Sequence, residues 1–207
     1  MSAQEKQLSA ELLLWGYSNG IFPMAVPEFN NQIFWFDPEE RAVMPIEEFH
    51  CPKSLRRVVR SGKFQVCCDR DFEGVIRGCA APRGEGEDAS TWISEEIIES
   101  YCELFQLGYA HSVECYLEDR LVGGLYGVAL GGVFFGESMF HTVRDASKVA
   151  LVKLVEHLRR RGYQLLDIQF MTDHLARFGA YELTRDEFQD RLRKALELPC
   201  EWGEFQG

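Results

Sequence analysis

Hydrophobic and polar positions in the second half of the chain predict three neighbouring strands, a helix and a further strand. Residues 111–140 are rich in β-branched and aromatic residues, and the short turns EDR and LGG divide them, which predicts three antiparallel strands. Residues 145–161 carry apolar side chains at 149, 152, 155 and 158 before Gly162, a helical spacing with a glycine stop. The apolar run 164–170 then predicts a strand parallel to the third one, reached by a right-handed crossover.

The remaining elements follow from helix caps, prolines and glycines. Residues 20–50 contain many prolines and aromatics, which predicts loops with short strands. Residues 80–91 predict an exposed loop. Helices are expected at 5–19, 53–63, 94–107 (capped by Ser94), 172–179 and after the capping box Thr184–Glu187, and a strand is expected near FQVCCD.

This order of elements predicts an α+β fold in which helices pack on one sheet. The strand–helix–strand step resembles the acetyltransferase-like (GNAT) fold. We therefore expect a small N-terminal α/β domain over residues 1–60 and a GNAT-like catalytic domain over residues 61–207.

The strand at 164–170, QLLDIQF, places two polar side chains among apolar ones. Side chains alternate between the faces of a strand, so Asp167 and Gln169 are expected to share a face. Burying such groups is unfavourable unless they are hydrogen-bonded or used. Glu137 follows two phenylalanines at the end of the third strand and is expected to approach Asp167, which would drive the pKa values of the two carboxyls apart. The simpler alternatives are that Asp167 pairs with an arginine and that Glu137 is a surface or capping acid.

The net charge of −11 over 207 residues argues against a protein that simply coats nucleic acid. One stretch, KSLRRVVRSGK, is basic and contains no acid. On a helix its first four cations fall on one face, either as a solvated surface or as a binding patch. The cations are Lys53, Arg56, Arg57, Arg60 and Lys63.

Cysteine usage indicates a reduced, cytoplasmic protein. The seven cysteines are an odd number and form no CxxC pair, which disfavours a disulfide framework or structural zinc. No apolar run reaches the 18 residues expected of a membrane span, and the N-terminus has no basic region typical of a signal peptide.

Several chemistries are disfavoured by the absence of their motifs. The sequence has no P-loop and no GxGxxG, and His111 and His174 lack metal-ligand spacing. Cys67–Cys68 has no evident activating partner. The segment before the helix at 145–161, HTVRDASK, contains no glycine, whereas acyl-CoA acetyltransferases bind pyrophosphate with a glycine-rich loop at a helix N-terminus.

Several motifs together resemble the leucyl/phenylalanyl-tRNA–protein transferase family. The resemblance extends from about residue 11 to residue 192, and LVGGLYGVALGGVFFGESMF is its longest and most specific part. The other motifs are GIFPM with FWFDPEERAV, STWIS, GYAHSVE, ASKVAL, and LLDIQ followed by DHLARFGA.

This resemblance implies an enzyme that moves leucine or phenylalanine, and less readily methionine, from aminoacyl-tRNA to proteins beginning with Arg or Lys. The transfer marks the acceptor for degradation by the N-end rule pathway. The resemblance also implies a GNAT-like C-terminal domain and no cofactor or metal. We further expect a monomer.

The same resemblance implies roles for individual residues. Asp167 would deprotonate or electrostatically orient the acceptor amine, Gln169 would hold the reacting groups, and Glu137 would contact the aminoacyl-adenosine. The apolar aminoacyl pocket would contain Leu125, Phe134 and Met139. Trp35 and Trp92 would stack on the terminal adenine, and the basic residues from Lys53 to Lys63 would contact tRNA phosphates.

Three other functions remain as alternatives. A GNAT-type acyl-CoA N-acyltransferase would bind acetyl-CoA, and an RNA-binding or adaptor module would need no Asp167. A sister family transfers leucine to N-terminal Asp or Glu but lacks the GESMF and DIQ pattern.

Overall fold

The structure is a computed structural model that describes residues 8–82 and 91–207. Its helices are α1 (Ala10–Ser18), α2 (Lys53–Arg60), α3 (Phe72–Ala80), α4 (Glu95–Gln106), α5 (Ala146–Arg161), α6 (Asp173–Ala176) and α7 (Arg185–Leu196), with one 3₁₀ turn, η1 (Pro27–Phe29). Its strands are β1 (Phe22–Val26), β2 (Gln32–Phe36), β3 (Glu40–Met44), β4 (Gln65–Cys68), β5 (Ala110–Leu117), β6 (Arg120–Leu130), β7 (Val133–His141), β8 (Leu165–Gln169) and β9 (Tyr181–Thr184).

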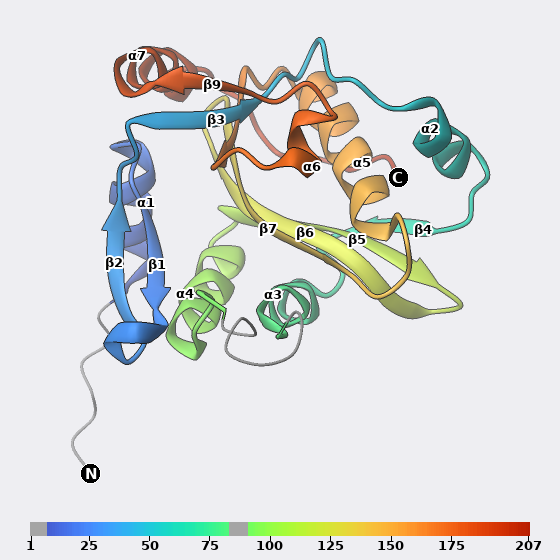
Figure 1. The fold of residues 1–207 in the computed structure, drawn as a ribbon, viewed down its shortest axis with the longest axis horizontal. Helices are drawn as coiled ribbons and strands as arrows, with labels where there is room; N and C mark the ends of the chain where they lie inside the picture. Colours follow the sequence, from blue (N-terminus) through green and yellow to red (C-terminus); the bar gives the residue numbers. More distant parts are fainter. Residues whose placement is uncertain (1–7, 83–90) are drawn as a thin grey trace.

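The strands form a large mixed sheet and a separate hairpin (Figure 1). The large sheet has the order β4-β5-β6-β7-β8-β3-β9, and the hairpin pairs β1 with β2. β7 and β8 are parallel, and the other neighbours in the large sheet are antiparallel. The three antiparallel strands and the parallel return through α5 are therefore confirmed, in a mixed α/β architecture.

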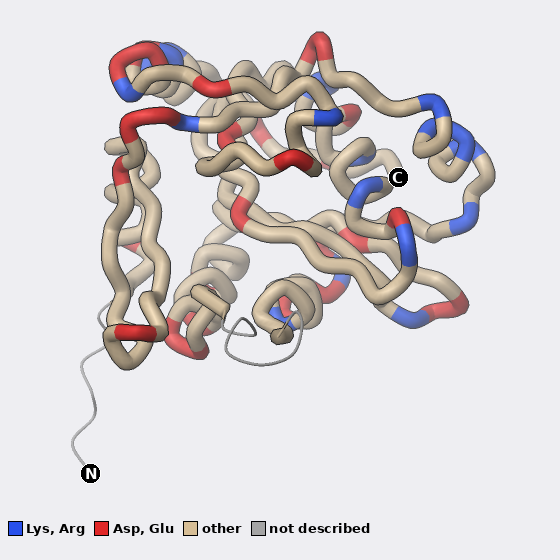
Figure 2. Tube along the Cα trace, viewed as in Figure 1, with Lys and Arg blue, Asp and Glu red and all other residues tan. Residues whose placement is uncertain are grey.

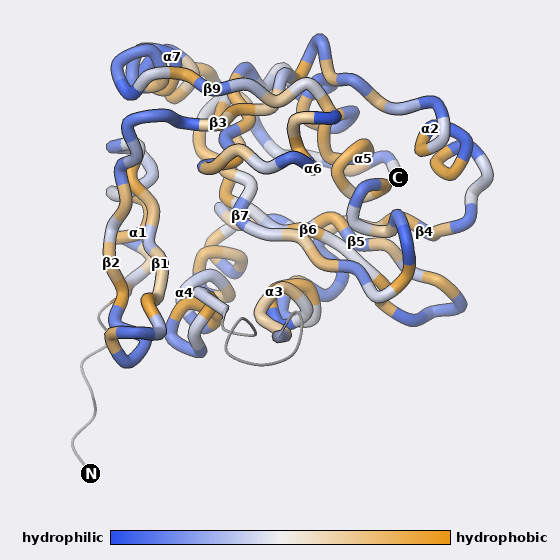
Figure 3. The backbone as a smooth tube through the Cα atoms, in the orientation of Figure 1, coloured by the Kyte–Doolittle hydropathy of each residue, from blue (hydrophilic) through white to orange (hydrophobic). Residues whose placement is uncertain are grey.

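Helices cover both faces of the large sheet. α5 packs on β5, β6 and β7 from one side, and α3 packs on β6 and β7 from the other (Figure 1). Two adjacent glycines of β6 permit this close approach, because a Cβ on Gly123 would meet Ala146 of α5 and one on Gly124 would meet Val75 of α3. The hydrophobic colour in Figure 3 accordingly includes the central strands and much of α5.

The predicted caps occur with the expected geometry. Ser94 caps α4 by accepting a hydrogen bond from the Ile97 amide, and Thr184 with Glu187 forms the capping box of α7. Gly162 ends α5 in the left-handed conformation, with φ +80°. The first helix is shorter than predicted because Ser9 caps it and α1 starts at Ala10.

Three elements of the sheet region differ from the prediction. α3 and β9 were not predicted, and β3 is an inner strand of the large sheet, between β8 and β9. β3 lies within residues 1–60, which were expected to form a separate domain, yet it pairs with β8 and β9 of the large sheet. The division of the chain into domains at residue 60 stays a prediction. Residues 83–90 of the predicted loop 80–91 lie outside the described part.

Candidate active site

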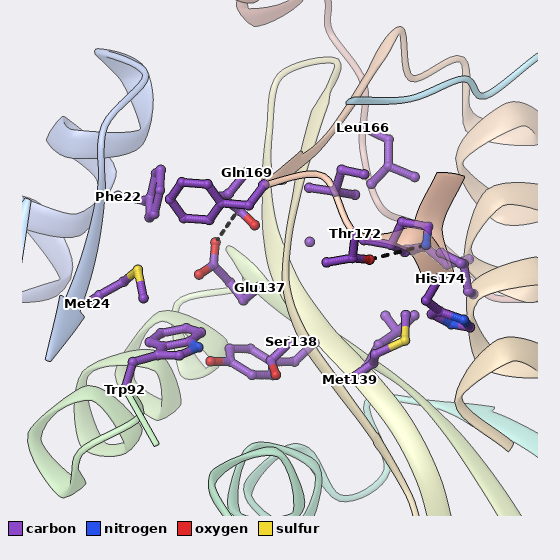
Figure 4. Close-up of a pocket in the computed structure, with 18 residues that line it drawn as sticks. Phe22, Met24, Trp92, Glu137, Ser138, Met139, Leu166, Gln169, Thr172 and His174 are labelled. Carbon is purple, nitrogen blue, oxygen red and sulfur yellow. Dashed lines mark hydrogen bonds between the residues drawn. The ribbon is translucent and has the colours of Figure 1, made fainter. Parts of the chain in front are cut away.

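A pocket of about 460 Å³ opens where β7 and β8 run side by side. The hairpin β1–β2 borders one side, and α5 and α6 border the other (Figure 4). The lining beside the hairpin, here called the aromatic lobe, is formed by Phe22, Met24, Trp92 and Phe170, and Glu137 and Gln169 lie at its edge towards the sheet. The lining on the α5 side, here called the apolar lobe, includes Leu125, Met139, Leu151, Leu154, Leu166 and Leu175, and Thr172 and His174 lie on the same side.

Glu137 points into the pocket because β7 contains a β-bulge. Tyr126 of β6 pairs with Ser138, and the next residue, Gly127, pairs with Gly136, which leaves Glu137 without a partner. A bulge re-aims the side chain of the extra residue and is common beside active sites. In Figure 4 the Glu137 carboxyl turns towards Gln169 between the hairpin and the sheet.

Glu137 is bound by uncharged donors and is held largely in its neutral form. The Tyr101 hydroxyl donates to Glu137 Oε2 at 3.4 Å, and the Tyr101 and Tyr17 hydroxyls are hydrogen-bonded to each other. Burial raises the pKa of Glu137 to about 8; the charge of Asp167 adds to the rise, and Tyr17, Arg41 and Tyr101 oppose it. The donors around Glu137 are thus uncharged.

The Gln169 side-chain amide links Glu137 to the backbone of both strands. In one orientation Nε2 donates to Glu137 Oε1 at 3.3 Å. In the flipped orientation the side-chain nitrogen donates to the carbonyl oxygens of Gly136 at 2.8 Å and Ile168 at 3.2 Å. The side-chain oxygen then takes the position beside Glu137 Oε1. The first orientation suits an ionised Glu137, and the second suits a protonated Glu137 that donates to the amide oxygen.

Asp167 is fully buried and paired with Arg41 of β3. Arg41 Nε donates to Asp167 Oδ1 at 2.9 Å, and Arg41 Nη2 donates to Oδ2 at 2.7 Å. The backbone N–H of Gln169 also donates to Asp167 Oδ1, at 2.9 Å. Both carboxylate oxygens are thus occupied by donors, and the alternative in which Asp167 pairs with an arginine is the one observed.

Arg41 is the main site-region residue that the sequence analysis missed. Its side chain is 1% exposed, and its guanidinium lies 4.5 Å from the Phe22 ring centroid and 4.6 Å from that of Phe188. The only signal in the sequence is a charged residue beside the apolar run AVM. Its partner is 126 residues away, so no local pattern connects the two.

Of the residues that were expected to contact the aminoacyl-adenosine, some line the pocket and others lie outside it. Leu125, Met139 and Trp92 line the pocket. Contrary to expectation, Phe134 lies outside the lining, since it is fully buried and its ring stacks on Trp202. Trp35 also lies outside the lining, because it projects to the other face of β2, where its ring covers Gly16 of α1.

The predicted basic helix is present as α2. Leu55 is its buried residue, and the four cations of the helix are exposed. Lys63 follows the helix, with Nζ 4.9 Å from the Phe64 ring centroid. Figure 2 shows this basic region at the end of the molecule opposite the hairpin.

No group of three or more His, Cys, Asp or Glu side chains among the described residues is arranged to hold a metal ion. No helix in the described ranges is long and apolar enough to span a bilayer.

An apolar lobe that adjoins a partly buried carboxyl–amide pair suits an enzyme that transfers an apolar acyl group, and comparison with known proteins gives the particular family. The family model described as leucyl/phenylalanyl-tRNA protein transferase matches residues 43–193, and the model of its N-terminal domain matches residues 6–39. The chain belongs to the leucyl/phenylalanyl-tRNA protein transferase family.

Individual relatives agree with this assignment. The chain is 53% identical to the leucyl/phenylalanyl-tRNA–protein transferase of Paramagnetospirillum magneticum over 92% of this chain and 90% of the relative. It is 49% identical to the Zymomonas mobilis enzyme of the same name over 91% of this chain and 70% of the relative. Among solved structures, the chain is similar to L-PGS from Bacillus licheniformis, with a TM-score of 0.44 at 9% identity over 76% of this chain and 65% of that one, a likeness too weak to bear on the assignment.

Proposed function

We propose that the protein transfers leucine, phenylalanine or methionine from aminoacyl-tRNA to the α-amine of proteins that begin with Arg or Lys. The observation that carries this proposal, beside family membership, is the two-lobed pocket, in which Glu137 and Gln169 lie where an apolar lobe meets an aromatic lobe. The product is marked for degradation by the N-end rule pathway. The protein acts as a cytoplasmic monomer without a cofactor.

The apolar lobe binds the aminoacyl side chain. Leu125 and Met139 form part of it, together with Leu151 and Leu154 of α5 and Leu166 of β8. Leucines and a flexible methionine adapt to side chains of different shape but discriminate weakly between similar apolar groups. Leucine, phenylalanine and methionine therefore fit, whereas a charged side chain would lose its hydration without a partner.

The reacting ester lies at the junction of the lobes, beside Glu137 and Gln169. The acceptor amine attacks the ester carbon, the new C–N bond forms, and the bond to the tRNA ribose oxygen breaks. The attacking nitrogen loses a proton and the ribose oxygen gains one. A pKa of about 8 allows Glu137 to accept and return this proton near neutral pH.

Asp167 serves as an electrostatic anchor rather than as the base. Both of its oxygens accept hydrogen bonds from Arg41, and its side chain is 0% exposed. The hydrogen bond that Asp167 accepts from the backbone N–H of Gln169 fixes the end of β8, where Gln169 adopts φ +57°. Asp167 thereby positions the Gln169 side chain, and its charge also raises the pKa of Glu137.

The remaining parts of the tRNA bind on either side of the ester. Trp92 offers the terminal adenine an aromatic face inside the pocket. The exposed cations of α2 are suited to the phosphates of the acceptor stem. The finer fold assignment, an acetyltransferase-like catalytic domain, is supported by the parallel β7–β8 pair that α5 connects.

A labelled transfer assay tests this function. The purified protein is incubated with radiolabelled Leu-tRNA and peptides that begin with Arg, Lys, Asp or Ala, with acetyl-CoA in a parallel reaction. Label is expected on the Arg and Lys peptides alone. Label on the Asp peptide, or acetylation in place of leucylation, would overturn the proposal.

A further inference from the structure

An apolar strip extends from the pocket along one face of the hairpin β1–β2. Directly opposite residues of an antiparallel pair share a face, and β1 pairs with β2 through Phe22–Phe36 and Met24–Phe34. Phe22 and Met24 line the pocket, and Figure 4 shows them projecting into it. The strip comprises Phe22, Met24, Phe29, Phe34, Phe36 and Phe170.

Ring contacts join the residues at each end of this strip, and Met24, which is paired with Phe34, lies between the two ends on the same face. Phe170 meets Phe22 at 5.6 Å between centroids, and Phe22 stacks on Phe36 at 6.0 Å. Phe34 and Phe29 meet at 5.5 Å near the tip of the hairpin, where η1 lies. The strip therefore connects the reaction centre with the far end of the hairpin.

Both ends of the strip are open to solvent. Phe29 is 60% exposed, Phe170 is 45% exposed and Phe34 is 37% exposed. Adjoining exposed aromatics beside a pocket indicate a binding surface rather than scattered surface residues. The opposite face of the hairpin is covered, since Trp35 packs on Gly16 of α1.

The charge around the strip indicates the kind of molecule that binds there. Residues 20–40 contain Glu28, Asp37, Glu39 and Glu40 and no Lys or Arg. Asp37 is paired with Arg185 of α7 at 3.0 Å, so the acidic character rests on the three glutamates. Figure 2 shows only acidic colour along the hairpin, whereas the cations of α2 lie at the other end of the molecule. An acidic surface repels nucleic-acid phosphates and attracts a basic polypeptide.

We infer that the apolar strip binds the acceptor polypeptide itself, over the residues that directly follow its N-terminal Arg or Lys, in extended conformation. This inference rests on the proposed function and adds a preference for apolar side chains after the first residue. An extended chain rises about 3.4 Å per residue, so five-residue β1 is matched by about five residues of acceptor. The acceptor polypeptide then reaches the ester from the hairpin side, and the acceptor stem of the tRNA lies towards α2.

The test compares acceptors that reach the strip with one that does not. KM and kcat are measured for a peptide beginning Arg-Phe-Leu-Phe, a peptide beginning Arg-Ser-Gly-Ser, and arginine amide. The variants are Phe29→Ser and Phe34→Ser. The matched control is Trp15→Ser, because Trp15 is a 55% exposed aromatic on α1, the helix that packs on the opposite face of the hairpin.

We expect Phe29→Ser and Phe34→Ser to raise the KM of the apolar peptide about tenfold, as truncation of an interface aromatic typically does. The KM values of arginine amide and of aminoacyl-tRNA are expected to stay unchanged, as is every constant of Trp15→Ser. An unchanged KM for the apolar peptide would overturn the inference. An increased KM for aminoacyl-tRNA would overturn it too, since the strip would then bind the tRNA end.

Two further results separate the inference from the function on which it rests. Loss of self-association in Phe29→Ser, measured by sedimentation with no change in peptide KM, would assign the strip to a second copy of the chain and overturn the inference. If the wild-type protein transfers nothing even to arginine amide, the proposed function fails and the inference fails with it. Transfer to all acceptors with equal KM would refute the inference alone.

Discussion

Replacing Glu137 by glutamine is expected to make the protein more stable while it removes activity. Glutamine resembles the protonated carboxyl in shape and remains neutral at every pH. Wild-type Glu137 must instead either ionise in a buried site or hold a proton that it would release in the unfolded chain. The difference between the two proteins therefore depends on pH.

The size of this effect follows from the pKa. Burial raises the pKa of Glu137 from 4.5 to about 8, and each pKa unit corresponds to about 1.4 kcal/mol. For a carboxyl whose folded pKa is raised, the penalty is absent below the unfolded pKa, grows as the pH rises, and is complete above the folded pKa. The penalty is thus near zero below pH 4.5, roughly 3 kcal/mol at pH 7, and roughly 5 kcal/mol above pH 8.

Urea denaturation of both proteins at pH 5, 6, 7 and 8 (roughly the span over which the linkage acts) measures this difference. The free energy of unfolding of Glu137→Gln should exceed that of the wild type by an amount that grows across the series. Leucine transfer by the variant should fall by about 10²–10⁴-fold, the range typical for loss of a general acid–base. A stability difference that does not change with pH would refute the reasoning.

Three further predictions concern the anchor, the basic helix and the apolar lobe. Arg41→Met should lower the free energy of unfolding by about 3–5 kcal/mol because it leaves Asp167 buried and unpaired; urea melts should show partial recovery when Asp167→Leu is added, and a fully stable single variant would contradict the pairing. Arg57→Gln with Arg60→Gln should raise the KM for aminoacyl-tRNA and reduce its salt dependence by about 0.7–0.9 per lost phosphate contact, with unfolding unchanged; an unaltered salt slope would exclude α2 from the tRNA site. Leu151→Phe should fill part of the apolar lobe and slow phenylalanine transfer about tenfold more than leucine transfer; equal effects in competition assays would place the side chain elsewhere.

Local patterns in the sequence predicted the elements whose signals are local. The turns between β5, β6 and β7, the stop of α5 at Gly162 and the capping box of α7 depend on residues a few positions apart. The alternation in β8 correctly separated Leu166 from Asp167, since the first packs with the α5 side of the core and the second meets Arg41.

Features that depend on long-range pairing were not predictable in this way. β3 enters the sheet by pairing with β8 and β9, which follow it by more than a hundred residues. The bulge at Glu137 adds one residue to β7, and so Phe134 and Met139 lie on the same face although their spacing is odd. A strict period of two cannot anticipate that shift.

The direction of the Glu137 side chain thus came from the structure. The sequence predicted that Glu137 approaches Asp167, whereas the hydrogen bond that the structure shows is with Gln169. The alternation also failed beyond Gln169, where positive φ turns the chain and brings Phe170 against Phe22. That turn places Phe170 in the pocket lining, beside the hairpin.

The central claim is that a peptide bond forms between the aminoacyl group of tRNA and the α-amine of an acceptor beginning with Arg or Lys. Mass spectrometry of an Arg-initiated peptide after incubation with Leu-tRNA tests it most directly, with the N-acetylated form of the same peptide as the control. The account predicts the addition of one leucine residue at the α-amine and no addition to the acetylated peptide. Addition to a side chain, or no addition by a folded protein, would contradict it.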